Sequence, residues 1–194
     1  MSTCGEISAS ILASCDNQIT GGVNPRLLLA NKSDVPESAY GYNVTNPKII
    51  ESITLSSSPA AYFYAFEGFR TSVAPKIATV DNPYRKAYDH TIEFIVFANT
   101  PEAKLQLEGM ADGTLVAIVE NNDTGVSGNA AFELYGKKQG LFAKIEREVN
   151  NADLQGAYKV TLNSPPDNKE PNLPATIFIT DYNTTKTMID ALVA

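Results

Sequence analysis

The sequence predicts a mainly β protein: an antiparallel β-sandwich or partly open barrel with one flanking helix and a short C-terminal helix. Apolar and polar residues alternate with a period of two along much of the chain, which is typical of strands. Turn-forming residues divide the chain into short segments, and only two stretches have a helical pattern. With 43% hydrophobic and 19% charged residues, the 194 residues fit one domain, 1–194, with a sizeable core.

The first half of the chain contains four expected strands, at 26–30, 48–55, 61–67 and 88–98. The last of these is the longest, and its two faces differ. One face carries Tyr88, His90, Ile92, Phe94, Val96 and Ala98. The other carries Asp89, Thr91, Glu93, Ile95 and Phe97. Such alternation indicates an antiparallel strand buried on one side.

A helix is expected directly afterwards, at 101–112. Thr100 is a suitable N-cap, Pro101 fits the first helical position, and Glu102 complements the helix dipole. Strands follow at 114–120, 130–135, 141–149, 157–162 and 176–180, and a last helix at 183–193. We expect 130–135 to form a hairpin with 114–120, and 157–162 to pair with 141–149.

Two segments lack clear periodicity. Residues 1–25 are expected to form an N-terminal arm, and residues 34–46 an assembly loop. Neither segment has an evident core of its own, so we expect a partner surface to order them. Cys4 and Cys15, near the start of the arm, are expected to be free thiols.

The charge and the apolar stretches exclude several classes of protein. The net charge is −7 and the basic residues are scattered, which argues against tight DNA binding. The N-terminus has no basic start and no long apolar core, so it does not read as a signal peptide. Apolar runs are far shorter than the ~20 residues that cross a bilayer, so no membrane partner is expected and synthesis takes place in the cytoplasm.

No catalytic, cofactor-binding or metal site is recognisable, which indicates a protein that is not an enzyme. The single histidine, His90, lies on the apolar face of a strand, where a hydrogen-bonded structural role is favoured over catalysis. Asp123 lies among asparagines that could offer oxygens to a cation, but a hairpin turn is favoured. Glu146 and Glu148 share one face of a strand beside Lys144, and a solvated face is the simplest interpretation.

Several segments, in this order, carry a resemblance to a known family: CGEISASILASCDN from residue 4, FEGFRTS from 66, YDHTIEFIVFANTPEAK from 88, VAIVENN from 116, FELYGKKQGL from 132, GAYKVTL from 156, KEPNLP from 169 and DYNTTKTMIDALV from 181. Together they resemble small virion proteins of phages and prophages of Bacteroidetes, and most of all their tail tube proteins. The resemblance covers nearly the whole chain.

The resemblance implies a structural subunit that assembles into hexameric rings. The inner sheets of the subunits join into one continuous β-barrel, and the rings stack into a tail tube through which DNA passes without specific binding. The implied partners are copies of the same chain and other tail proteins such as the tape measure and the tail terminator, and the implied location is the virion tail. The alternative is another phage structural protein, either a tail completion (terminator) protein or a head decoration protein.

Within such a tube, acidic side chains lining the channel would repel DNA phosphates. The candidate lumen-facing residues are Asp89 and Glu93, or Glu146 and Glu148, on the strands expected to be long and barrel-forming. The alternative places the same four residues on the outer, solvated surface.

Overall fold

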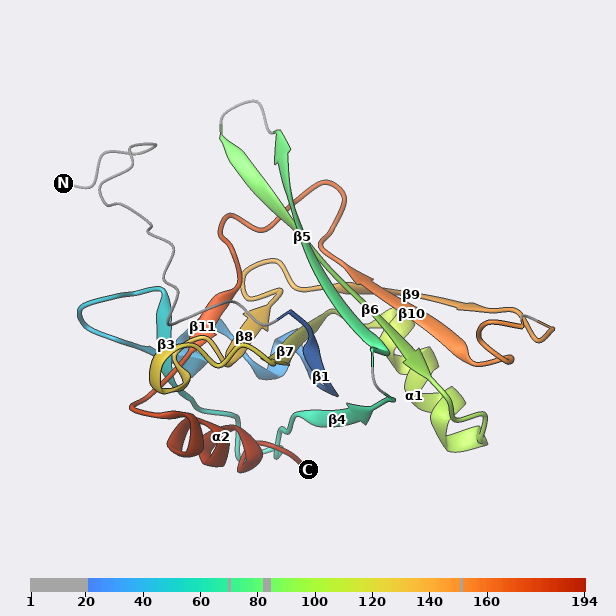
Figure 1. Ribbon diagram of the computed structural model, residues 1–194, viewed down its shortest axis with the longest axis horizontal. Helices are drawn as coiled ribbons and strands as arrows, with labels where there is room; N and C mark the ends of the chain where they lie inside the picture. Colours follow the sequence, from blue (N-terminus) through green and yellow to red (C-terminus); the bar gives the residue numbers. More distant parts are fainter. Residues whose placement is uncertain (1–20, 70, 82–84, 151) are drawn as a thin grey trace.

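The computed structural model describes residues 21–69, 71–81, 85–150 and 152–194, and the ribbon is shown in Figure 1. Most of the predicted arm, including Cys4 and Cys15, lies outside the described residues. The chain forms two sheets and two α-helices.

The larger sheet has seven strands in the order β2-β3-β11-β8-β7-β1-β4. Their bounds are β1 Val23–Asn31, β2 Tyr40–Tyr42, β3 Ile49–Ile53, β4 Tyr64–Glu67, β7 Leu115–Asn121, β8 Phe132–Tyr135 and β11 Ala175–Ile177. All neighbours in this sheet pair antiparallel except β11 and β3, which pair parallel.

The smaller sheet has four strands, all antiparallel, in the order β5-β6-β10-β9. Their bounds are β5 Val73–Asp81, β6 Lys86–Val96, β9 Phe142–Arg147 and β10 Tyr158–Asn163. In Figure 1 the β5–β6 hairpin runs diagonally across the molecule and extends past the other strands. Neither sheet closes into a barrel, so the predicted mainly β, sandwich-like class is confirmed.

Two apolar clusters hold these layers together. The first lies between the two sheets and includes Leu27, Leu29, Ile92, Phe94, Ala117, Val119, Val160 and Leu162. The second lies on the other face of the large sheet and includes Leu28, Ile50, Phe63, Ile118, Leu134, Ile177 and Ile189. Adjacent residues of β1 and β7 alternate between the two clusters, so the large sheet is apolar on both faces and is the central layer.

The predicted helix at 101–112 is confirmed as α1, Pro101–Asp112. The Thr100 hydroxyl accepts a hydrogen bond from the Ala103 amide at 3.2 Å, which makes Thr100 the N-cap. The C-terminal helix α2 spans Tyr182–Asp190, and Asp181 caps it by accepting from the Thr184 amide at 2.9 Å. Ile189 of α2 is buried against the large sheet, and α2 covers that sheet's outer face.

Both predicted strand pairings are confirmed: β7 pairs with β8, and β9 pairs with β10. The prediction missed β5, because Pro75 in its first half argues against a strand. Proline is tolerated here because β5 is an edge strand. Three 3₁₀ turns, Lys32–Asp34, Glu37–Ala39 and Val126–Gly128, were also not predicted.

The boundaries of the two expected assembly segments need correction. Residues 23–25, which the prediction assigned to the arm, belong to β1, which begins at Val23. The expectation that 34–46 lacks a core is wrong for its first half: Val35, Ala39 and Tyr40 are buried in the cluster beneath α2. Residues 36–38 and the turn after β2 are exposed, and in that turn Asn43 accepts from the amides of Thr45 and Asn46. An assembly role for 34–46 remains a prediction.

Candidate functional site

The outer face of the four-stranded sheet, the face turned away from the core, carries mostly polar and charged side chains. It is made by alternate residues of its strands: Ala74, Lys76, Ala78, Asp89, Thr91, Glu93, Ile95, Lys159, Thr161, Asn163, Phe142, Lys144 and Glu146. Their neighbours in sequence, such as Ile92, Phe94, Val160 and Leu162, point into the core. We call this surface the polar face.

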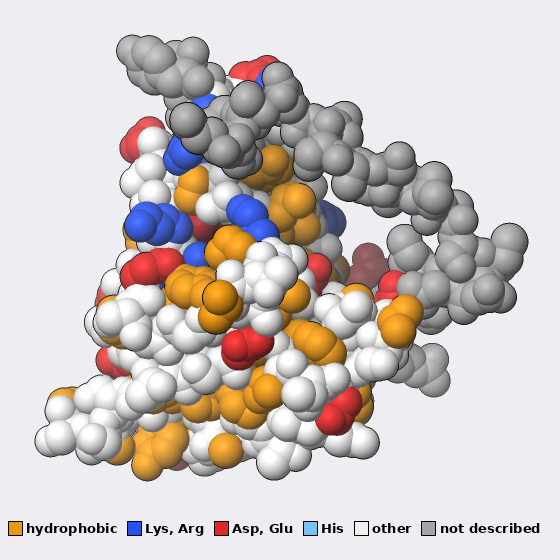
Figure 2. All heavy atoms as spheres, turned by 90° about the vertical axis from the view of Figure 1, so that its left-hand side faces the viewer, with side chains coloured by type: hydrophobic (Ala, Val, Ile, Leu, Met, Phe, Trp, Pro, Cys, Tyr) orange, Lys and Arg blue, Asp and Glu red, His pale blue; other side chains and the backbone are white. Residues whose placement is uncertain are grey.

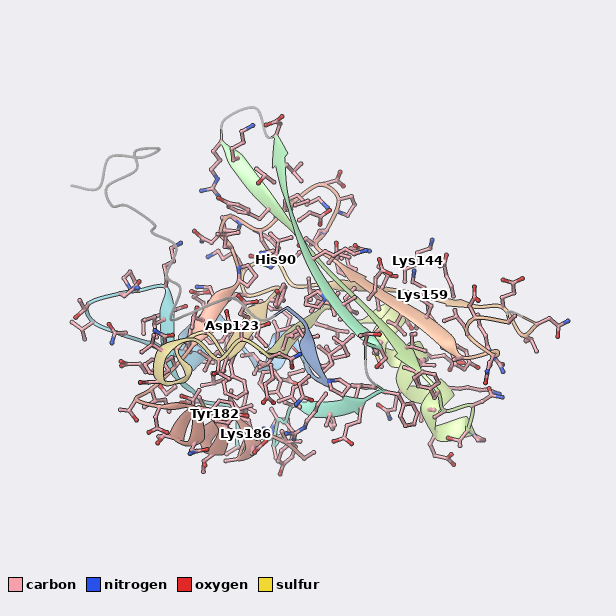
Figure 3. All side chains as sticks on the ribbon, viewed as in Figure 1. His90, Asp123, Lys144, Lys159, Tyr182 and Lys186 are labelled. Atoms are coloured by element: carbon pink, nitrogen blue, oxygen red, sulfur yellow. The ribbon has the colours of Figure 1, made fainter. Side chains whose placement is uncertain are left out.

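Strand register sets which of these side chains lie side by side. Glu93 of β6 stands opposite Ala74 of β5 and Thr161 of β10, and Thr161 in turn stands opposite Lys144 of β9. One step along the strands, Lys159 of β10 stands opposite Glu146. Figure 3 shows Lys144 and Lys159 on these neighbouring strands, well away from Tyr182 and Lys186 on α2. The register therefore brings lysines and carboxylates together across the sheet.

Glu93 is the centre of this arrangement. Its carboxylate lies 2.9 Å from the Lys76 ammonium and 2.8 Å from the Lys159 ammonium, so one acidic residue joins β5, β6 and β10. The Glu93 side chain is 28% exposed, whereas Lys76 is 63% exposed. Hydrogen bonds from Lys159 and Lys76 lower the pKa of Glu93, which keeps the carboxylate charged at neutral pH.

The other carboxylates of the polar face are also paired. Glu146 lies 2.7 Å from the Lys144 ammonium, which lowers the pKa of Glu146. Asp89 lies 2.9 Å from the ammonium of Lys169, which reaches over from the loop after β10. The face thus carries three carboxylates and three lysines of its own, and Lys169 adds a fourth lysine from the loop, so every carboxylate is paired and the whole group has a net charge of +1.

Three of the four predicted lumen residues, Asp89, Glu93 and Glu146, therefore share one surface, although sequence reasoning offered them as two alternative pairs. Glu148 is exposed and follows the end of β9 at Arg147. The position of all four residues relative to a channel remains a prediction. An acidic lining does not follow from this face, because each of the three carboxylates on it is paired with lysine.

Sequence reasoning missed most of these lysines. Lys76 was hidden because β5 was not predicted. The place of Lys159 on this face could have been predicted, because in an alternating strand it falls on the face opposite the buried Val160. Lys169 comes from an irregular loop, whose path no periodic pattern encodes.

Among the described residues, both edge strands of the four-stranded sheet, β5 and β9, pair with only one strand each. The backbone groups on the other side of each edge strand are therefore not paired by another described strand. Ile77 on β5 and Phe142 on β9 are 42% and 45% exposed. Pro75 has no N–H group to donate to a neighbouring strand. The residues of β5 that come after Pro75 therefore offer the more complete set of backbone groups for pairing.

A second cluster of polar groups is buried where the two sheets meet. The ring of His90, only 1% exposed, accepts a hydrogen bond at Nδ1 from the Gly136 amide at 3.3 Å and contacts the Asn172 carbonyl through Nε2 at 3.0 Å. Glu170, 2% exposed, accepts from the Gln139 amide at 2.7 Å and from the Lys138 amide at 3.1 Å. These bonds hold the 136–140 turn and the loop after β10 against β6.

The partners of His90 require a neutral ring with the proton on Nε2. Burial lowers the pKa of His90 to about 4, and this agrees with the structural role that its place on the apolar face predicted. Burial raises the pKa of Glu170, although backbone N–H groups oppose that shift. Both side chains form hydrogen bonds with backbone groups, which is typical of a structural role.

We expect the stability of the protein to fall between pH 6.5 and about pH 4. In the unfolded chain His90 takes up a proton near pH 6.5, whereas in the fold it does so only near pH 4, so acid favours unfolding across this window. A difference of this size corresponds to about 3 kcal/mol. Glu170 partly offsets the loss, since its raised pKa makes the fold take up a proton first.

Urea unfolding at pH 7.5 and pH 4.5 measures this effect. The matched variant is His90→Gln, which is less stable at neutral pH but has no ring to protonate. The wild type should lose more stability between the two pH values than the variant does. Equal losses would show that His90 does not carry the pH dependence.

Other features of the surface give weaker indications of a functional site. A cavity of about 920 Å³ beside the start of β5 is lined by Val23, Pro25, Val73 and Glu133, among others. Asp123 accepts from the Gly125 amide at 3.1 Å, which makes it part of a turn.

Among the described residues no group of three or more His, Cys, Asp or Glu could hold a metal ion, and none of their helices is long and apolar enough to cross a membrane. On the side shown in Figure 2, the Lys and Arg side chains lie in the upper half, together with Asp and Glu, whereas Asp and Glu also occur in the lower half.

No protein-family model, curated protein or solved structure matches this chain significantly.

Proposed function

We propose that this chain is a structural subunit of a phage tail tube, in which copies join into rings, the rings stack, and DNA passes through the central channel. The observation that carries the proposal is the four-stranded sheet with two open edges, β5 and β9, and a polar face that the core does not use. The resemblance of the sequence to tail tube proteins supplies the identity of the assembly.

The two open edges differ, which suits a ring. β5 carries Lys76 on the polar face, and β9 carries Lys144 and Glu146 there. Pairing β9 of one copy with β5 of the next is a head-to-tail contact, and repeating one head-to-tail contact generates a ring when the rotation closes. The sheet then continues from copy to copy, so every interior edge is paired and the polar faces form one wall.

The polar composition of that wall suits a channel for DNA. An apolar lining would be costly to hydrate, and an unpaired basic lining would bind phosphates. The polar face has neither property, because its lysines are matched with carboxylates. On this proposal Asp89, Glu93 and Glu146 face the lumen, and the protein needs no cofactor and performs no catalysis.

Negative-stain electron microscopy of the purified full-length chain at increasing concentration tests the proposal. Rings with a central hole, or stacked tubes, are the expected result. The alternatives give other outcomes: a single ring that never stacks indicates a tail completion protein, and a monomer that binds only preformed heads indicates a decoration protein. Either outcome would overturn the tail tube assignment.

A further inference from the structure

The polar face contains more lysine than a surface passed by DNA would tolerate if those lysines were free. Lys76, Lys144 and Lys159 all stand on it, and Lys76 and Lys144 are 63% and 71% exposed. Duplex DNA presents one negative charge per ~1.7 Å of its axis, so free ammonium groups on a surface beside it form phosphate contacts. Some feature must prevent these lysines from acting as a binding site.

We infer that Glu93 masks Lys76 and Lys159 and so keeps the polar face from binding the phosphates of duplex DNA. The inference takes its ligand, duplex DNA, from the proposed function. It goes beyond that function by assigning the non-adhesive property of the face to one residue.

The geometry supports this role. The two oxygens of the carboxylate are used separately: Oε1 lies 2.9 Å from Lys76 and Oε2 lies 2.8 Å from Lys159. Glu93 is on the second strand of the sheet, between an edge strand and the third strand, so both lysines reach it from either side. Its own side chain is less exposed than either lysine, at 28% against 63% and 39%. A phosphate would have to displace a carboxylate that is already in place.

Lys144 has its own partner in Glu146 at 2.7 Å, within one strand. Glu93 differs because one carboxylate serves two lysines. Removing the charge of Glu93 therefore frees two ammonium groups at once, and it changes the local charge of the Lys76–Glu93–Lys159 group from +1 to +2.

The experiment compares the wild type with Glu93→Gln, which keeps the size of the side chain and removes its charge. The probe is a fluorescently labelled 30-base-pair duplex, and the readout is fluorescence anisotropy over a series of salt concentrations. We expect Glu93→Gln to bind at least about tenfold more tightly at low salt, with a salt slope steeper by about 2, since two more lysines contact phosphate.

Two further variants test the explanation. Glu108→Gln removes one negative charge from the exposed face of α1 and should leave DNA binding as in the wild type. Adding Lys76→Gln and Lys159→Gln to Glu93→Gln should return the affinity to the wild-type level. Equal binding by Glu93→Gln and Glu108→Gln would overturn the inference, because only net charge would then matter.

The result is independent of whether rings form. The binding measurement uses the soluble chain at a concentration below assembly, and circular dichroism confirms that each variant is folded. Tighter binding by Glu93→Gln without rings in the microscope would leave the masking intact and remove the tail tube. Rings without a change in DNA binding would remove the masking and leave the tail tube.

Discussion

We expect the Phe142→Lys variant to fold normally and to lose self-assembly. Phe142 is on the open edge strand β9 and is already 45% exposed, so a lysine there removes little buried apolar area from the subunit. Surface changes of this kind shift stability by about 0.5 kcal/mol. On the proposed pairing of β9 with β5 of the next copy, the same position lies at the contact between copies.

The proposed contact between β9 of one copy and β5 of the next should be sensitive to an added charge, because the same contact recurs between all neighbouring copies of a ring. The polar face of β5 carries Lys76, and a new ammonium on the neighbouring β9 faces it with the same sign. Like charges brought together in an interface cost several kcal/mol, and every joint of a ring bears that cost. We therefore expect at least about a tenfold fall in the association constant between copies, measured from the sedimentable fraction over a series of protein concentrations, since 1.4 kcal/mol already changes an equilibrium constant tenfold.

The matched control is Val126→Lys. Val126 is 64% exposed and belongs to the turn Val126–Gly128, which packs against the start of α2 rather than against the four-stranded sheet. It should assemble like the wild type in the same sedimentation assay. Assembly of Phe142→Lys to the wild-type extent, with an unchanged thermal midpoint, would exclude β9 from the contact between copies.

Local signals predicted much of the fold. The alternation of 88–98 placed Glu93 and Ile92 on opposite faces, and burial confirms this, since Ile92 is fully buried. The Thr100-Pro101 start of α1 was readable because capping depends on neighbouring residues alone. The small-sheet pairing of β9 with β10 followed from two alternating segments joined by a turn.

What the sequence did not predict depends on contacts between distant segments. The parallel pairing of β11 with β3 joins residues more than 120 positions apart, and no local pattern encodes it. Pro75 concealed an edge strand, and with it one of the two lysines held by Glu93. The burial of Glu170 is not visible in KEPNLP, since a glutamate in a proline-rich loop ordinarily faces water.

Glu170 gives the largest expected loss of stability. Its carboxylate lies between the loop after β10 and the 136–140 turn, and its backbone pairs with Tyr88 in both directions, at 2.8 and 3.0 Å. Gly136 and Gly140 have positive φ values of 70° and 78°, so the turn itself can point successive amides toward one carboxylate. Glu170 thus fastens the β5–β6 hairpin to the end of the large sheet.

Replacing Glu170, whose side chain is only 2% exposed, by alanine leaves the Lys138 and Gln139 amides without their acceptor. Each unsatisfied buried donor costs about 1–3 kcal/mol, so we expect Glu170→Ala to lose about 4 kcal/mol in urea unfolding at pH 7. Glu170→Gln keeps one acceptor oxygen and should lose about half as much. Asp167→Ala, an exposed position of the same loop, should change stability by less than about 0.5 kcal/mol. A loss below about 1 kcal/mol for Glu170→Ala would mean that water replaces the carboxylate and that the turn is held by other contacts.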